Sequence, residues 1–211
     1  KWETTARFNV GLDAMLFDNR LALSLDWYKS KTSDLLVQKD YQFVTGMGKY
    51  WANGGELENT GIEATVNAKL INTKNWQWEL GASVGHYKNE ITKLPEGATE
   101  FTTNMYDGTI LTRVGQAAGM FYGYKTEGVF ATTEDAVASG KYIMDNTGKK
   151  TYFEAGDMNF VDKDGNGEIN GSDRFVIGDP NPDIYGNIFA NFYFGKRWSV
   201  SANFNYSIGN D

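Results

Sequence analysis

The sequence contains no cysteine, a single histidine and no long run of apolar residues. Without cysteine the chain forms no disulfide bond, no thiolate zinc site and no cysteine nucleophile. A membrane-spanning helix needs about eighteen consecutive apolar residues, which no stretch approaches, so any contact with a bilayer is expected to use β-strands. The net charge is -7 and Lys and Arg do not cluster, which argues against a nucleic-acid partner.

The chain also lacks an initiator Met and the charged and apolar regions of a signal peptide at its start. We therefore expect a fragment or a processed chain. Hydrophobic residues make up 41% and aromatic residues 15%, which is enough for a hydrophobic core in one or two domains.

What the sequence does contain is strict alternation of apolar and polar residues, clearest at residues 184–194 and 198–208. A period of two predicts β-strands, and the short separation at residues 195–197 predicts a hairpin. Each arm has about ten to twelve residues, which suits a tilted strand that crosses a bilayer.

Two more hairpins are predicted by the same pattern, at residues 8–28 with a turn at 18–20 and at residues 62–84 with a turn at 72–75. The alternation fades at residues 29–58, where Gly, Lys, Ser and Asn predict a long loop, and again at residues 89–183. Tight turns at one end and long polar connections at the other are typical of an outer-membrane β-barrel.

The predicted fold class is therefore all-β: part of an antiparallel transmembrane β-barrel, with six wall strands and long extracellular loops. Aromatic residues near both ends of the strands would form the two interfacial girdles. The girdle residues are Phe17, Trp76, Trp78, Phe194 and Trp198 near the tight turns and Trp27, Tyr28, Tyr87 and Tyr206 at the far ends. The polar face towards the lumen would include Asp13, Asp26, Glu63, Asn187 and Asn203.

The alternative that these patterns leave open is a secreted, calcium-stabilised β-sandwich that binds glycans. Alternation does not show whether the apolar face meets lipid or protein. Six strands do not close a membrane barrel, which needs at least about eight, so further strands are expected outside this sequence.

Within the long segment, residues 162–173 match the spacing of a calcium-binding loop. Oxygen ligands at the first, third, fifth, seventh and twelfth places, with Gly167 at the sixth, can surround one Ca²⁺. The predicted ligands are Asp162, Asp164, Asn166, Glu168 and Asp173. The twelfth residue is Asp where Glu is usual, and no flanking helices are evident, so the loop is EF-hand-like. A polar turn without metal is the alternative.

The aromatic segment at residues 119–130 supplies the candidate substrate contacts Phe121, Tyr122 and Tyr124. Flat aromatic faces can stack on sugar rings, although the same residues can simply pack a loop subdomain. His86 continues the apolar phase of its strand and is interpreted as an interfacial residue. Since no nucleophile elbow, phosphate loop or zinc helix occurs, no enzyme activity is expected.

Several ordered blocks resemble the SusC/RagA family of TonB-dependent outer-membrane transporters. They are Lys1-Trp-Glu-Thr-Thr, Asn9-Val-Gly-Leu-Asp13, Lys31-Thr-Ser-Asp-Leu-Leu36, Glu58-Asn-Thr-Gly-Ile-Glu63, Phe121-Tyr-Gly-Tyr-Lys-Thr-Glu-Gly-Val-Phe130 and Asp173-Arg-Phe-Val-Ile-Gly-Asp-Pro-Asn-Pro-Asp183. The resemblance implies a barrel of about 22 strands in the intact protein. Residues 1–211 would be a part near its C-terminal end, without the plug domain.

The resemblance also implies a function in the outer membrane of a Gram-negative cell. The family imports oligosaccharides or peptides together with a SusD-like surface lipoprotein, and TonB supplies energy through N-terminal parts that this sequence does not contain. Residues 89–183 would then form extracellular loops.

Overall fold

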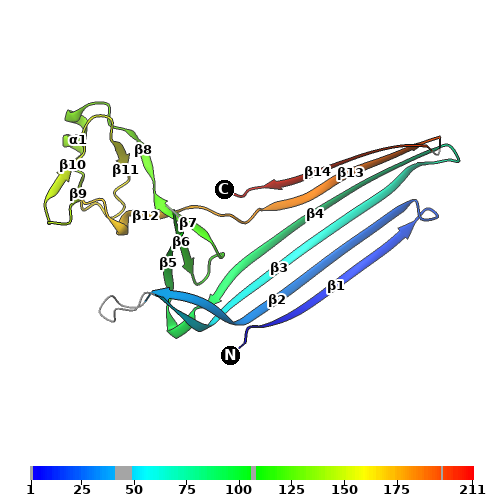
Figure 1. Ribbon diagram of the computed structural model, residues 1–211, viewed down its shortest axis with the longest axis horizontal. Coiled ribbons are helices and arrows are strands. Elements are labelled where there is room, and N and C mark those ends of the chain that lie inside the picture. Colours follow the sequence, from blue (N-terminus) through cyan, green and yellow to red (C-terminus); the bar gives the residue numbers. More distant parts are fainter. Residues whose placement is uncertain (1, 41–48, 106–107, 196) are drawn as a thin grey trace. The chain divides into compact units, whose positions relative to one another are not determined.

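The structure is a computed structural model that describes residues 2–40, 49–105, 108–195 and 197–211 (Figure 1). The chain divides into two compact units. The first contains Lys1–Phe101, Thr112–Ala118 and Pro180–Asp211, and the second contains Thr102–Leu111 and Gly119–Asp179. Among the described residues, no helix combines the length and the apolar character that crossing a membrane requires.

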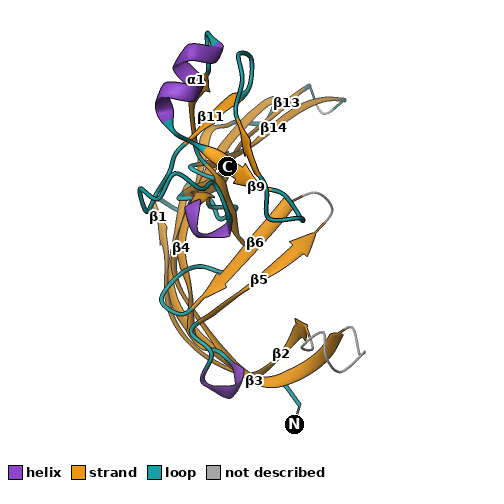
Figure 2. Ribbon diagram, turned by 90° about the vertical axis from the view of Figure 1, so that its left-hand side faces the viewer, coloured by secondary structure: helices purple, strands orange, loops and turns teal. Residues whose placement is uncertain are grey.

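The first unit is built on one antiparallel sheet in which neighbouring strands follow the order β1-β2-β3-β4-β13-β14. Figure 2 shows that these strands form a single curved layer. The predicted six wall strands are confirmed, and the third hairpin has the predicted bounds. The strands are β1 (Thr4–Leu16), β2 (Leu21–Asp40), β3 (Lys49–Asn72), β4 (Trp76–Lys93), β13 (Ile184–Phe194) and β14 (Trp198–Ile208).

The register places the apolar residues of all six strands in phase. Leu25 lies opposite Leu12 on one side and Ala64 on the other, and Ile188 lies between Ala82 and Phe204. Because side chains alternate along a strand, this register gathers the apolar residues on one face of the sheet and the polar residues on the other. We call these the apolar face and the polar face.

The prediction of a long loop at residues 29–58 is wrong, because β2 continues to Asp40 and β3 begins at Lys49. Lys29 Nζ lies 2.8 Å from Glu58 Oε2, and Lys31 Nζ lies 2.6 Å from Glu56 Oε2. On the opposite face, the amide of Asn89 donates a 2.6 Å hydrogen bond to Asn59 Oδ1. Where both faces of a hairpin meet water, polar pairs replace apolar alternation, so the period of two disappears although the strands continue.

The tight turns at one end of the sheet are confirmed. In the first turn Phe17, Asp18 and Asn19 have positive φ, and the backbone N–H of Arg20 donates to the Phe17 carbonyl at 3.1 Å. In the second, Thr73 Oγ1 accepts the N–H of Trp76 at 3.1 Å. Such local hydrogen bonds fix a short reversal and with it the register of the hairpin.

The connection between β4 and β13 starts at residue 94 and not at 89, because β4 extends to Lys93. It begins with a 3-10 turn, η2 (Pro95–Gly97). The longer strands of the connection form one sheet, in which neighbouring strands follow the order β12-β7-β6-β5. The shorter strands form two separate pairs, β11 with β8 and β10 with β9. The larger sheet contains β5 (Glu100–Met105), β6 (Gly108–Arg113), β7 (Met120–Tyr124) and β12 (Arg174–Gly178). The pairs contain β8 (Thr126–Val129), β9 (Tyr142–Met144), β10 (Lys150–Tyr152) and β11 (Met158–Phe160).

The second unit also has a short helix, α1 (Thr133–Ser139), and a small hydrophobic core. Thr132 caps the helix by accepting the N–H of Asp135 at 3.1 Å. A second 3-10 turn, η3 (Gly171–Asp173), precedes β12. The core consists of Phe130, Ala136, Phe153 and Ile169, with Tyr124 and Phe160 packed against it.

Candidate functional site

The apolar face of the six-stranded sheet is exposed to a degree that is unusual for large hydrophobic side chains. Phe8, Leu12, Val200 and Phe204 each expose between 63% and 68% of their surface. In a sandwich these residues would be the buried core, whereas on a barrel wall they meet lipid tails. The sheet therefore supports the predicted barrel wall and not the β-sandwich alternative.

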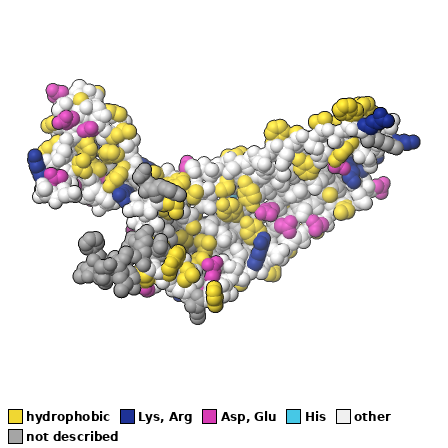
Figure 3. All heavy atoms as spheres, in the orientation of Figure 1, with side chains coloured by type: hydrophobic (Ala, Val, Ile, Leu, Met, Phe, Trp, Pro, Cys, Tyr) yellow, Lys and Arg dark blue, Asp and Glu magenta, His cyan; other side chains and the backbone are white. Residues whose placement is uncertain are grey.

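Aromatic residues gather at the end of the sheet where the tight turns lie. The ring centroids of Trp76 and Phe194 are 4.1 Å apart, and those of Trp76 and Phe192 are 5.2 Å apart. Trp198 is 74% exposed. Figure 3 shows hydrophobic and basic side chains together at this end. Amphipathic rings next to cations are the composition expected where a barrel wall meets lipid headgroups.

The polar face carries the predicted lumen residues. Asp26 lies directly opposite Glu63, and Ser83 lies between Thr65 and Asn187. Ser83 Oγ donates a 2.6 Å hydrogen bond to Asn187 Oδ1. Asp13 and Asn203 fall in the same phase of their strands. This face presents carboxylates, amides and hydroxyls, as the wall of a water-filled pathway does.

Three glycines on the polar face are buried beneath aromatic rings from neighbouring strands. A Cβ at Gly61 would lie 2.5 Å from Cζ of Tyr28, and one at Gly85 would lie 2.5 Å from Cζ of Tyr185. A Cβ at Gly81 would lie 2.3 Å from the Phe189 ring. Large rings that cover strand glycines are a known device for packing a sheet surface.

The assignment of Tyr28 and Tyr87 to the outer girdle is therefore wrong. Both belong to the polar face, because Gly61 pairs with Tyr28 on one side and Tyr87 on the other. Tyr87 contacts Tyr185 edge-to-face at 5.8 Å between ring centroids. Trp27 and Tyr206 lie on the apolar face as predicted. An aromatic residue near a strand end belongs to the girdle only if the alternation of its strand places it on the apolar face.

His86 lies on the apolar phase of β4, opposite Ile62. Its Nδ1 is 2.6 Å from the carbonyl oxygen of Asp183, so the ring N–H donates to that carbonyl in the corresponding tautomer. The hydrogen bond ties β4 to the residue that precedes β13. The interfacial position of His86 stays a prediction.

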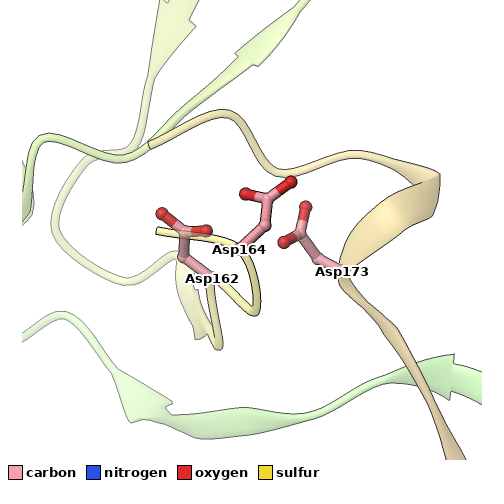
Figure 4. A group of neighbouring side chains, drawn as sticks. All are labelled: Asp162, Asp164 and Asp173. Atoms are coloured by element: carbon pink, nitrogen blue, oxygen red, sulfur yellow. The ribbon is translucent and has the colours of Figure 1, made fainter. Parts of the chain in front are cut away.

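The predicted calcium loop brings three of its five candidate ligands together. Oxygen atoms of Asp162, Asp164 and Asp173 all lie within 4.8 Å of one another, and their carboxylates converge in Figure 4. Asn166 contacts this cluster through its amide N–H, which donates to Asp164 Oδ2 at 3.0 Å, while its Oδ1 accepts the N–H of Glu168 at 2.6 Å. The predicted contribution of Glu168 is its main-chain carbonyl, and its carboxylate is not part of the cluster.

The loop is folded by its own backbone. Asp162 accepts the N–H groups of Gly167 and Gly165, each at 2.7 Å, and the Gly167 bond first and then the Gly165 bond hold the pKa of Asp162 below its ordinary value. The carboxylate of Asp173 is fully buried and accepts the N–H groups of Lys163 and Asn170 at 2.9 and 2.8 Å. Gly167 has a φ of 81°, which favours glycine.

The loop is also anchored to the core of the second unit. Ile169 is buried in that core, and its N–H donates to the Tyr142 carbonyl at 2.8 Å. The N–H of Tyr142 donates to the Gly167 carbonyl at 2.9 Å. No Lys, Arg or His nitrogen of the described residues lies within 4.0 Å of the three carboxylates. Three converging, uncompensated carboxylates with hard oxygen donors fit Ca²⁺ or a similar cation.

Phe121, Tyr122 and Tyr124 lie on β7 and line one cleft of about 360 Å³, together with Arg174 of β12. Tyr124 also packs edge-to-face on Phe160, with ring centroids 5.6 Å apart. Tyr124 therefore packs within the second unit, as the alternative to substrate contact expects, and it also borders the cleft together with Phe121 and Tyr122. Arg174 was not among the sequence candidates, because only the pairing of β12 with β7 brings it to this place.

The geometry thus defines a class of protein: a curved antiparallel sheet with a lipid-compatible apolar face and a polar face is part of an outer-membrane β-barrel. The profile of the family described as TonB dependent receptor-like, beta-barrel matches residues 1–207. The chain belongs to that family, which confirms the resemblance and the outer-membrane location.

Named relatives and solved structures agree with this assignment. The chain is 35% identical over its whole length to TonB-dependent receptor P3 of Formosa agariphila and 29% identical to TonB-dependent receptor SusC of Bacteroides thetaiotaomicron, covering 21% and 20% of these proteins. The RagAB peptide transporter structure superposes with a TM-score of 0.74 and 24% identity, over 99% of this chain and 21% of that one. The chain therefore spans about a fifth of the length of these proteins.

Proposed function

We propose that the protein to which this chain belongs is a TonB-dependent importer of the SusC/RagA type. The observation that carries the proposal is the two-faced sheet: lipid-compatible on one face and lined with carboxylates, amides and hydroxyls on the other. In this function the chain supplies six neighbouring strands of the wall. The polar face lines the pathway, and the remaining strands and a plug domain belong to other parts of the protein.

The connection between β4 and β13 is assigned to the cell surface. Short turns of outer-membrane barrels lie in the periplasm and long connections lie outside. The tight turns of β1-β2, β3-β4 and β13-β14 share one end of the sheet, so the connection leaves from the opposite end. The second unit of the chain, which is formed by residues of this connection, would then be available to contact substrate and a surface partner.

The proposed partners are a SusD-like surface lipoprotein and TonB, and the proposed cargo is an oligosaccharide or a peptide. A solved structure that shares this fold is described as a peptide transporter, RagAB, which is a property of that protein. For this chain, the aromatic cleft and the polar wall support uptake of a polar, flexible cargo.

The test is uptake by cells that make the complete protein. Deletion of its gene is expected to abolish growth on one class of oligosaccharide or peptide, and the same loss is expected when TonB is deleted or the proton gradient is collapsed. Affinity purification from the membrane fraction should recover a second, lipid-anchored protein. Undiminished uptake of every glycan and peptide class after the deletion would refute the proposal.

We also propose that the loop at residues 162–173 holds one structural Ca²⁺. Asp162, Asp164 and Asp173 would supply carboxylate oxygens, and the ion would neutralise their mutual repulsion and stiffen the second unit. The support is the convergence of these carboxylates without a neighbouring cation and the anchoring of Ile169 in the core.

A further inference from the structure

The cleft of the second unit exists because two neighbouring strands separate. In the described part of the chain, β6 and β7 share only two register pairs, Ile110 with Phe121 and Leu111 with Met120. Beyond these pairs, Gly108 and Thr109 of β6 and residues 122–124 of β7 border an open space of about 360 Å³. The volume lies at the lower end of the range for small-molecule sites.

Three aromatic residues and one arginine border this space, and Tyr122, Tyr124 and Arg174 share one face of the paired strands β7 and β12, while Phe121 belongs to the other face. Phe121 is 37% exposed, and Tyr122 and Tyr124 are half-buried. Arg174 lies directly opposite Tyr124 in the register, and its guanidinium carbon is 5.3 Å from the centre of the Tyr124 ring. A guanidinium that rests on an aromatic ring is held in place while its in-plane N–H groups stay available to an anion.

Two lysines lie near Phe175, the residue that follows Arg174 on β12. Lys125 Nζ and Lys163 Nζ lie 5.1 and 5.2 Å from the centre of the Phe175 ring, and Lys163 donates to the Arg174 carbonyl at 3.1 Å. Among the described residues, no carboxylate lies within 4.0 Å of the charged groups of Lys125, Lys163 or Arg174. Arg174 is the one charged residue among the described residues that border the cleft, and a cation without a carboxylate partner favours an anionic ligand.

The shape of the cleft separates two kinds of anionic ligand. An extended peptide that adds a strand needs a continuous free edge. Here only about three residues of β7 border the gap before the strand ends at Tyr124, since β12 occupies the other edge. A compact ring with apolar faces can rest against an aromatic side chain, and its hydroxyls can bond to the polar groups that border the cleft.

We propose that this cleft binds a carboxylate-bearing sugar residue of an oligosaccharide, with Arg174 paired to the carboxylate and Tyr122 and Tyr124 against the sugar ring. The inference rests on the proposed function as an importer and names the class of its cargo. It assigns Arg174 as a specificity residue, because a bidentate arginine–carboxylate pair distinguishes a uronate from the corresponding neutral sugar.

The test measures binding to the complete transporter, purified in detergent with its partner lipoprotein. The probes are tetragalacturonate, the same oligosaccharide with its carboxyl groups reduced to alcohols, and tetraglutamate. The unaltered protein is expected to bind tetragalacturonate at least about tenfold more tightly than the reduced form, as the loss of a charged hydrogen-bond pair predicts. This comparison requires no variant and holds whether or not a substitution folds.

Arg174→Gln is expected to remove that preference. Lys150→Gln is the matched control, because Lys150 also rests on a tyrosine, with Nζ 4.0 Å from the Tyr142 ring centre, but does not border the cleft. The control should change affinity less than about twofold. Equal binding of the charged and reduced oligosaccharides, equal losses in both variants, or tighter binding of tetraglutamate would overturn the inference.

The outcomes also separate this inference from the proposed function. The protein could import a neutral glycan or a peptide in a TonB-dependent way and bind tetragalacturonate no more tightly than its reduced form. That result would support the importer and refute the uronate site. Uronate binding without any TonB-dependent uptake keeps the site and removes the importer.

Discussion

The hydroxyl of Tyr185 donates a 2.7 Å hydrogen bond to Oε1 of Glu63, two strands away. The intervening residue on β4 is Gly85, which pairs with both. The Tyr185 ring lies over Gly85 and so reaches Glu63, because glycine leaves the space that a Cβ would fill. The hydrogen bond on the lumen wall therefore depends on a glycine that takes no part in it.

Gly85→Ala is accordingly expected to displace the Tyr185 ring and break its bond to Glu63. Overpacking of this kind costs about 1–3 kcal/mol, to be measured as the urea midpoint of the complete transporter. In a Tyr185→Ala background the same change should cost much less, because the ring that it meets is gone. Equal costs in both backgrounds would show that the ring is not the cause.

The extended hairpin of β2 and β3 is expected to loosen in acid. Hydrogen bonding to Lys31 first, and its positive charge with that of Lys93, hold the pKa of Glu56 below its ordinary value of 4.5. A lowered carboxyl pKa stabilises the fold above that ordinary value, and the stabilisation is lost as the pH falls through the folded-state pKa.

The protection of the amides at residues 50–56, measured as hydrogen exchange relative to the intrinsic rate at each pH, should therefore fall below about pH 4.5. In Glu56→Gln the carboxylate is absent, so protection should be lower at neutral pH and this component of its pH dependence should vanish. The change is small, because the pair is exposed to solvent. An unchanged pH profile in the variant would assign the acid response to other groups.

The sequence was sufficient to predict the wall where one face of a strand is apolar. In β13 and β14 every position falls on the predicted face, because a one-residue slip would turn the whole apolar set inward. The sequence did not predict the parts of β2 and β3 that lie away from the tight turns, where Lys29 and Lys31 pair with Glu58 and Glu56. Cross-strand ion pairs join residues that are distant in sequence, so they leave no local period.

The candidate sites also differ in whether they depend on neighbouring residues or on residues that are distant in sequence. The spacing of Asp162, Asp164 and Asp173 within one short loop predicted that their side chains would meet, because such a loop fixes its own geometry. Arg174 borders the same cleft as Phe121 only through the pairing of β12 with β7 and the separation of β6 from β7. Neither the pairing nor the separation has a signature in the order of residues.

The two faces of β14 predict opposite responses to the same substitution. Ala202 lies on the apolar face near the middle of the strand, and Asn205 lies on the polar face. Ala202→Arg is expected to destabilise the barrel by about 2–4 kcal/mol, the cost of Arg at the middle of a bilayer, whereas Asn205→Arg should cost little. Urea titration of the complete protein in lipid vesicles measures both. Equal costs would contradict the assignment of the faces.

Removal of calcium is expected to loosen residues 162–173 and leave the wall intact. Limited proteolysis with EGTA should cleave this loop faster than proteolysis with calcium, while the strands of the first unit stay protected. Asp164→Asn should weaken the calcium effect, because it removes one of three converging carboxylates. Asp145→Asn is the control, since Asp145 shapes another turn by accepting the Thr147 and Lys149 N–H groups. If cleavage does not depend on calcium in the unaltered protein, the loop is a polar turn that folds without metal.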